Sequence, residues 1–149
     1  MERISRSLLI LIFLIAVVAP IQMASAQDLC VNVAHANLRA GPSTDEGITW
    51  IVNQYMPLNQ VERKGNWYQV MDLDGDRHWI FHTLVNSKIK CVIIKAERAN
   101  VHKGPGTDYA KWFTVERYTT FKKIGEEGMW IKVEYEGKVM WILSNLVWP

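Results

Sequence analysis

The strongest constraint on this chain is an internal repeat. The segment 36–45 returns as 99–108, an offset of 63 residues, and the same offset held over 36–70 gives 11 identities in 35 positions without a gap. One deleted residue then aligns Trp79-Ile80 with Trp141-Ile142. Because the identities fall on turn-forming residues and aromatics, the 149 residues are predicted to fold as two copies of one small unit.

Within each copy the hydrophobic pattern predicts short strands. Residues 67–73 and 130–135 alternate between apolar and polar side chains. Each segment is followed by a dipeptide typical of a hairpin turn, Asp74-Gly75 in the first copy and Glu136-Gly137 in the second. Neither copy has the 3.6-residue periodicity of an amphipathic helix.

The predicted fold class is therefore all-β, with two tandem small barrels over residues 27–87 and 88–149. Units of this size leave no room for a β-sandwich. The apolar carboxyl end, 146–149, is expected to close the second barrel as a final strand. The short linker 86–88 predicts that the barrels pack against each other.

The amino terminus has the pattern of a cleaved signal peptide, predicted over residues 1–26. Residues 8–19 lack a polar side chain, and Ala24-Ser25-Ala26 supplies the small residues of a cleavage site. The apolar run is short for a membrane span of ~20 residues, although an uncleaved anchor is the alternative. We expect an exported protein, periplasmic or extracellular, without stable membrane insertion.

Export changes the interpretation of the two cysteines, Cys30 and Cys91. In an oxidising compartment they are the one possible intramolecular pair, and a disulfide would close a loop of 61 residues. The chain-entropy model gives such a link about 4 kcal/mol. Free or intermolecular thiols are the alternative.

Composition narrows the classes of function. The formal charge of +2 does not suggest a nucleic-acid partner, and 49% hydrophobic residues exclude a disordered chain. A catalytic cysteine is not expected, because both cysteines lie in the first strands of the copies. The turn Asp72–Asp76 lacks the later ligands of a calcium loop, and His78 and His82 are too far apart on a strand for zinc. We expect no enzyme activity and no cofactor or metal.

The repeated motifs resemble the bacterial SH3-type domain (SH3b), a small barrel of exported bacterial proteins. The resemblance covers nearly the whole mature chain, but His102 replaces the family's arginine in the second copy, and His78 and Met140 replace its last glycine. The matching motifs are Asn37-Leu38-Arg39-Ala40-Gly41-Pro42, Gly65-Asn66-Trp67 and Trp79-Ile80 in the first copy, and Asn100-Val101-His102-Lys103-Gly104-Pro105, Gly128-Met129-Trp130 and Trp141-Ile142 in the second.

The resemblance implies a cell-wall-targeting or peptide-binding module with an aromatic-lined groove. The arginine is a candidate because a guanidinium can hold a carboxylate, although it can instead pair with Asp45 across its own loop. Asn37 and Asn100 are expected to form turns. The candidate ligand-binding residues are Arg39, Trp50, Tyr55, Phe113 and Tyr118, whereas Trp67, Trp79, Trp130 and Trp141 are expected in the cores.

Two hypotheses for function follow. The first is a non-catalytic exported module that recognises peptidoglycan peptides or an envelope protein through this groove. The second is a structural or assembly adaptor, whose barrels pack on each other or on a partner without a small ligand.

Overall fold

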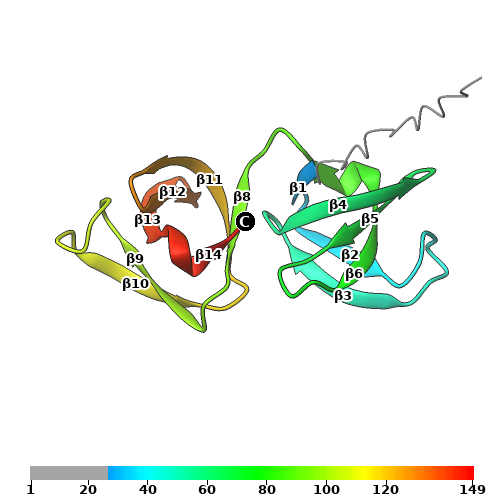
Figure 1. Cartoon of the computed structure of the whole chain (residues 1–149), viewed down its shortest axis with the longest axis horizontal. Helices are drawn as coiled ribbons and strands as arrows, with labels where there is room; N and C mark the ends of the chain where they lie inside the picture. Colours follow the sequence, from blue (N-terminus) through cyan, green and yellow to red (C-terminus); the bar gives the residue numbers. More distant parts are fainter. Residues whose placement is uncertain (1–26) are drawn as a thin grey trace, which may run out of the picture.

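The computed structural model describes residues 27–149, so the predicted signal peptide lies outside the described residues. The chain forms two antiparallel sheets of seven strands, each coiled into a small barrel, and β8 runs between them (Figure 1). Within 27–149, no helix has the length and apolar character needed to cross a membrane.

Each barrel has seven strands and one 3-10 turn. The first contains β1 (Gln27–Val31), β2 (His35–Arg39), β3 (Ile48–Asn53), β4 (Pro57–Lys64), β5 (Trp67–Met71), β6 (Arg77–Phe81), η1 (His82–Leu84) and β7 (Val85–Asn86). The second contains β8 (Cys91–Ile94), β9 (Arg98–His102), β10 (Lys111–Glu116), β11 (Thr120–Glu127), β12 (Trp130–Tyr135), β13 (Lys138–Leu143), η2 (Ser144–Leu146) and β14 (Val147–Trp148).

The strand order is the same in both sheets. It is β3-β2-β6-β5-β4-β1-β7 in the first and β10-β9-β13-β12-β11-β8-β14 in the second, which confirms the duplication. The predicted final strand also forms, since Val147 pairs with Ile94 of β8.

The pairing register shows that the two cysteines are not at equivalent positions. Cys30 pairs with Pro57 in the first barrel, whereas Thr120, the counterpart of Pro57, pairs with Ile93. Cys30 therefore corresponds to Ile93, and Cys91 lies two residues earlier on the equivalent strand. The disulfide therefore joins two positions that are not equivalent in the two copies.

The core of the first barrel includes one residue from the second. Ile93 of β8 is fully buried in the first core, and Trp148 of β14 packs against the same core. The other buried members are Leu29, Val31, Ala36, Leu38, Val52, Met56, Leu58, Val70, Ile80 and Val85. Because burial of an apolar side chain contributes roughly 1.5–3 kcal/mol, the two barrels stabilise each other.

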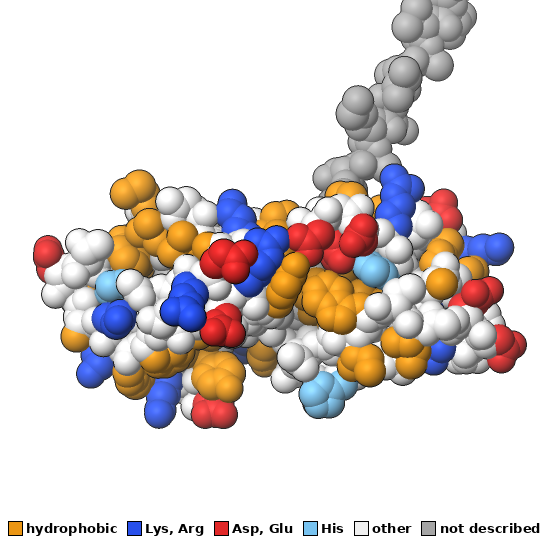
Figure 2. All heavy atoms as spheres, turned by 90° about the horizontal axis from the view of Figure 1, so that it is seen from below, with side chains coloured by type: hydrophobic (Ala, Val, Ile, Leu, Met, Phe, Trp, Pro, Cys, Tyr) orange, Lys and Arg blue, Asp and Glu red, His pale blue; other side chains and the backbone are white. Residues whose placement is uncertain are grey.

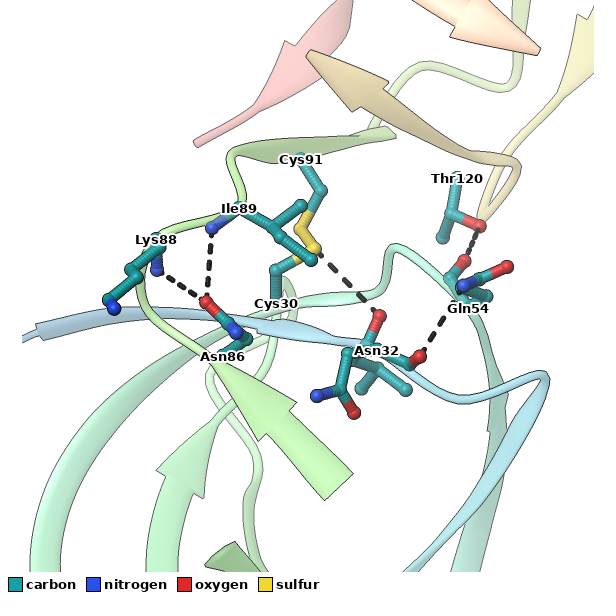
Figure 3. The surroundings of a disulfide bond; sticks show 9 residues. Cys30, Asn32, Gln54, Asn86, Lys88, Ile89, Cys91 and Thr120 are labelled. Carbon is teal, nitrogen blue, oxygen red and sulfur yellow. Dashed lines mark hydrogen bonds between the residues drawn. A yellow bond between two sulfur atoms is a disulfide. The ribbon is translucent and has the colours of Figure 1, made fainter. Parts of the chain in front are cut away.

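A covalent bond joins the barrels beside this shared core. Cys30 and Cys91 form the predicted disulfide, with their Cα atoms 6.0 Å apart, within the usual range (Figure 3). The Asn86 side-chain oxygen accepts hydrogen bonds from the amides of Lys88 (2.6 Å) and Ile89 (3.2 Å), and so fixes the linker.

Polar and aromatic contacts complete the junction. The Asp74 carboxylate accepts hydrogen bonds from Arg117 Nη2 (2.7 Å) and the Tyr118 hydroxyl (2.8 Å). The Tyr118 ring meets Trp50 edge-on, with centroids 5.6 Å apart, and Thr120 Oγ1 donates to the Gln54 carbonyl at 2.7 Å. Figure 2 shows acidic, basic and hydrophobic side chains side by side at the middle of the molecule, where the barrels meet.

Candidate functional site

Each barrel carries a pocket at the same place in its fold. The two cavities, here called the twin pockets, have volumes of about 560 Å³ in the first barrel and about 510 Å³ in the second. The first is lined by His35, Ala36, Asn37, Arg39, Pro42, Ser43, Thr44, Trp67, Phe81 and Leu84, and the second by Arg98, Asn100, His102, Thr107, Thr114, Trp130, Leu143 and Leu146.

The twin pockets are a product of the repeat. At the repeat offset of 63, or 62 after the deleted residue, every lining residue of the second pocket except Thr114 matches a lining residue of the first. Both volumes lie within the range of small-ligand sites. The two surfaces therefore agree in place, in size and in most of their lining.

Aromatic and aliphatic side chains form the floor. In the first pocket Trp67 of β5 meets Phe81 of β6 edge-on, with centroids 5.4 Å apart. In the second, Trp130 of β12 meets the His102 imidazole at 5.1 Å. Both tryptophans are half-buried. The expectation that they fill the cores was wrong, because β5 and β12 turn these side chains to the outer face of the barrel.

A row of polar side chains forms one wall of each pocket. In β2 the buried Ala36 and Leu38 alternate with His35, Asn37 and Arg39, so the three polar residues share the outer face. In β9 the same alternation places Arg98, Asn100 and His102 on the corresponding face. Among the described residues that line the twin pockets there is no carboxylate. The lining of each pocket therefore combines basic and amide side chains with an apolar floor.

The asparagines of these rows differ from expectation. Asn37 and Asn100 lie in the middle of β2 and β9 and not in turns, so the turn prediction was wrong. The Asn100 side-chain oxygen accepts a hydrogen bond from the Thr114 hydroxyl at 3.0 Å. Their recurrence reflects a shared place in the pocket wall.

Arg39 holds the loop that rims the first pocket. Its Nη1 donates to the carbonyls of Thr44 (3.0 Å) and Glu46 (2.7 Å). No ion pair with Asp45 is found among the described residues, so the guanidinium fixes the loop through backbone oxygens. Its Nε and Nη2 groups have no partner within the described part of the chain.

His102 takes over this role in the second copy. Its Nδ1 lies 3.1 Å from the carbonyl oxygen of Tyr109, which is the counterpart of Glu46. The imidazole thus keeps one of the two loop hydrogen bonds that the guanidinium makes. Replacement of the arginine does not remove the loop support.

Glycines allow the rim loops to close. A Cβ on Gly41 would lie 2.8 Å from the Glu46 side chain, and one on Gly104 would overlap the Tyr109 ring. The glycine of each motif is therefore explained by close packing of the loop on itself.

Two of the predicted aromatic residues line a groove between the barrels, which shares His35 with the first of the twin pockets. Tyr55 and Tyr118 have left-handed backbones (φ 65° and 69°) at equivalent turns, and both line a groove of about 800 Å³. Trp50 contacts Tyr118 at the junction. Phe113 lies on β10 outside this groove and packs beside Trp112, with ring centroids 6.2 Å apart.

The predicted site residues thus fall into three places. Arg39 lines the first of the twin pockets, Trp50, Tyr55 and Tyr118 lie at the barrel junction, and Phe113 is exposed on β10. The pocket residues Trp67 and Trp130 were not among the predicted site residues. The signal was present in the segments 35–39 and 98–102, where arginine and histidine exchange positions around a common asparagine.

The predicted hairpin turn at Asp74-Gly75 is held by a buried carboxylate. Asp72 Oδ1 accepts from the amides of Asp74 (2.9 Å) and Asp76 (3.0 Å), and Oδ2 lies 3.1 Å from His78 Nε2. His78 Nδ1 in turn lies 2.8 Å from the Thr49 hydroxyl. A hydroxyl, an imidazole and a carboxylate in this order can serve catalysis, but these residues line neither the twin pockets nor the groove. Their evident effect is to shape the turn that presents Asp74 to the second barrel.

The pKa of Asp74 is lowered by this junction. The hydrogen bond from the Tyr118 hydroxyl is the largest cause, followed by the hydrogen bond and charge of Arg117. The pKa of Arg117 is raised by its hydrogen bonds with Tyr118 and Asp74. Both shifts favour the charged pair across the junction.

Comparison with known proteins gives matches in both halves of the chain. Two family models, each described as a bacterial SH3 domain, match residues 32–86 and 97–147. The Bacillus subtilis (strain 168) protein YrvJ, which is named as an N-acetylmuramoyl-L-alanine amidase, is 21% identical over 134 residues. The alignment covers 83% of this chain but only 26% of that relative.

Similar solved structures include two proteins named for NlpC. An NlpC/P60 family protein from Bacillus cereus has a TM-score of 0.38 at 14% identity, covering 81% of this chain and 55% of that one. NlpC1 from Trichomonas vaginalis has a TM-score of 0.36 at 9% identity, covering 84% and 46%. This chain spans about half the length of each.

Proposed function

This chain belongs to the bacterial SH3 domain family in both of its halves, and we propose that it is an exported, non-catalytic module that binds cell-wall peptides. The observation that carries the proposal is the pair of twin pockets. One pocket on one barrel can be an accident of packing, whereas the same pocket on two barrels of divergent sequence indicates a shared use.

The lining indicates the chemistry of the ligand. Each pocket combines an apolar floor with one arginine, one histidine and one asparagine, and the described lining residues include no acidic side chain. A guanidinium binds a carboxylate with two parallel hydrogen bonds. A short peptide with a free carboxyl group and small apolar side chains satisfies both parts of the pocket.

The sequence relative supports a place in the cell wall. YrvJ is named for activity on N-acetylmuramoyl-L-alanine, and its aligned part, about a quarter of its length, corresponds to the barrels described here. A targeting role for such barrels in both proteins is consistent with this overlap. The predicted signal peptide and the disulfide favour an oxidising compartment outside the cytoplasm.

Two linked pockets increase the strength of attachment to a polymer. Once one pocket is occupied, the second meets its ligand at a high local concentration, so weak single sites combine into tight binding. The disulfide and the shared core fix the spacing between the barrels.

An assembly adaptor is the second candidate function. The observation that favours it is the use of Trp50 and Tyr118, which contact each other across the barrel junction instead of remaining free for a ligand. Under this alternative the twin pockets would carry no small molecule.

Binding to purified peptidoglycan sacculi tests the proposal. The oxidised chain 27–149 is compared with the double variant Asn37→Asp/Asn100→Asp, which places a carboxylate in the centre of each polar row. Like-charge repulsion predicts at least a tenfold loss of binding for the double variant and a smaller loss for either single variant.

Gln60→Glu is the matched control, because it adds the same charge on β4 away from the twin pockets. It is expected to bind as the unmodified chain does. Equal binding by the folded double variant would refute the assignment to the twin pockets. No binding by the unmodified chain would refute the cell-wall proposal and leave the adaptor.

A further inference from the structure

The polar rows of the twin pockets run in opposite orders. Along β2 the outer face presents His35, Asn37 and Arg39, whereas along β9 it presents Arg98, Asn100 and His102. The two strands occupy the same position in sheets of the same strand order. The guanidinium and the imidazole therefore exchange ends of the pocket, while the asparagine keeps the centre.

The arginine end of each row can only donate hydrogen bonds. Arg39 uses Nη1 for the loop carbonyls and keeps Nε and Nη2. Arg98 has one partner within the described residues, Glu116, at 4.0 Å, and the two side chains are 76% and 80% exposed. An ion pair this open is weak. Both guanidinium groups are available to a carboxylate.

The histidine end of each row accepts a hydrogen bond. His102 Nδ1 faces the Tyr109 carbonyl oxygen at 3.1 Å, and that oxygen can only accept. A hydrogen bond to this oxygen requires a proton on Nδ1, and in that tautomer Nε2 is the acceptor. His35 Nδ1 is held in the same way by the Asn53 side-chain oxygen at 3.1 Å. Each imidazole thus offers Nε2 to an N–H group of a ligand.

We infer that each pocket binds a short peptide in one orientation along its polar row, and that the two barrels bind it in opposite orientations. The inference rests on the proposed function, since it assumes that the twin pockets bind peptides. In the first barrel the ligand carboxylate lies at Arg39, beside the rim loop, and its amino-terminal N–H lies at His35. In the second the carboxylate lies at Arg98 and the N–H lies at His102, beside the rim loop.

The spacing sets the length of the ligand. Four residues along a strand separate the two ends of each row by about 13 Å. A peptide of roughly three or four residues in an extended conformation spans this distance. The twin pockets accordingly favour a short peptide with a free carboxyl end over a long polymer segment.

Paramagnetic NMR on the oxidised, ¹⁵N-labelled chain 27–149 tests the direction. The probe is Ala-Ala-Ala with a free carboxylate and a nitroxide acyl group on its amino end. In the first barrel the label is expected to broaden the amides of Ala34 and Asn53 more than that of Thr44. In the second it is expected to broaden Thr107 and its loop more than Glu116.

A variant with the row reversed gives an internal comparison. His35→Arg/Arg39→His gives β2 the order found in β9, and the imidazole at position 39 is expected to hold the rim loop as His102 does. The label in the first barrel should then move to the rim-loop end, near Thr44. The carboxyl-amidated probe should bind both pockets of the unmodified chain at least tenfold more weakly.

The outcomes separate the two proposals. Saturable binding with the label at the same end of both pockets would overturn the opposite-direction inference and leave peptide binding intact. Equal affinity for the amidated probe would overturn the role of the guanidinium groups. If no amide signal in either pocket shifts or broadens at a millimolar concentration of the probe, both this inference and peptide recognition by the twin pockets are overturned.

Discussion

At the scale of single residues, different side chains make the same loop hydrogen bond in the two copies. Arg39 and His102 both hydrogen-bond the carbonyl seven residues later, of Glu46 in one loop and Tyr109 in the other. Conversely, Trp50 and Phe113 are equivalent in sequence, but one is covered at the junction and the other is exposed. The environment of a position depends on which barrel it belongs to.

Removal of the Arg39 side chain is expected to loosen the first rim loop. Arg39→Ala deletes two hydrogen bonds to backbone carbonyls and should lower the free energy of unfolding by about 1–3 kcal/mol, whereas Arg39→His should lose less because one bond can persist. Urea unfolding measures the difference. Arg98→Ala is the matched control, expected within about 0.5 kcal/mol of the unmodified chain. Equal losses for Arg39→Ala and Arg98→Ala would contradict the loop role.

The rim glycines are expected to differ in their tolerance of a methyl group. Gly104→Ala meets the rigid Tyr109 ring, whereas Gly41→Ala meets only the flexible Glu46 side chain. Overpacking should destabilise the Gly104→Ala variant by about 1–3 kcal/mol and the Gly41→Ala variant by less. Thermal unfolding of the two variants compares them directly. The same melting temperature for both would show that the Tyr109 ring moves aside without cost.

At the scale of strands and turns, the sequence predicted the elements but not the faces they present. Period-two alternation located β5 and β12, and Glu136-Gly137 is the two-residue turn of the β12–β13 hairpin. Asp74-Gly75 instead lies within a longer loop, 72–76, because Met71 pairs with Arg77. The alternation does not say which face turns inward, so Trp67 and Trp130 were assigned to the cores although they line the pockets. The asparagines were assigned to turns because residue preference alone carries no information on the strand that contains them.

The buried Asp72 is expected to be the main support of the first hairpin turn. Asp72→Ala leaves two backbone amides and His78 without their acceptor, which should lower the free energy of unfolding by about 2–4 kcal/mol. Urea unfolding monitored by tryptophan fluorescence measures this change. Asp76→Ala, in the same turn but with an exposed side chain, serves as the control and should cost far less. A loss no larger than that of the control would mean that other contacts hold the turn.

At the scale of the whole molecule, contacts at the junction hold the two barrels together. Ile93 enters the first core, the disulfide links the barrels, and Asp74, Arg117 and Tyr118 form a charged contact across the junction. The repeat predicted two barrels, and the short linker predicted that they pack. The contact pairs were beyond sequence analysis because they join non-equivalent positions of the two copies.

The junction is expected to weaken in acid. The pKa of Asp74 is lowered in the folded chain, so its stabilising effect is complete above the unfolded value of about 4 and is lost as the pH falls through the folded value. Nuclear Overhauser contacts between the Trp50 and Tyr118 rings should fade over that acid range. In Asp74→Asn these contacts should be weaker at neutral pH and insensitive to acid. Contacts that persist in acid in the unmodified chain would show that the shared core alone orients the barrels.

The measurement that most directly tests the central claim is a chemical-shift map of the whole chain with a soluble peptidoglycan stem peptide. The twin pockets predict saturable shifts at Asn37, Asn100 and the indole N–H groups of Trp67 and Trp130, with little change at Tyr55 and Tyr118 in the groove. Shifts confined to the groove, or absent from both barrels, would contradict the account.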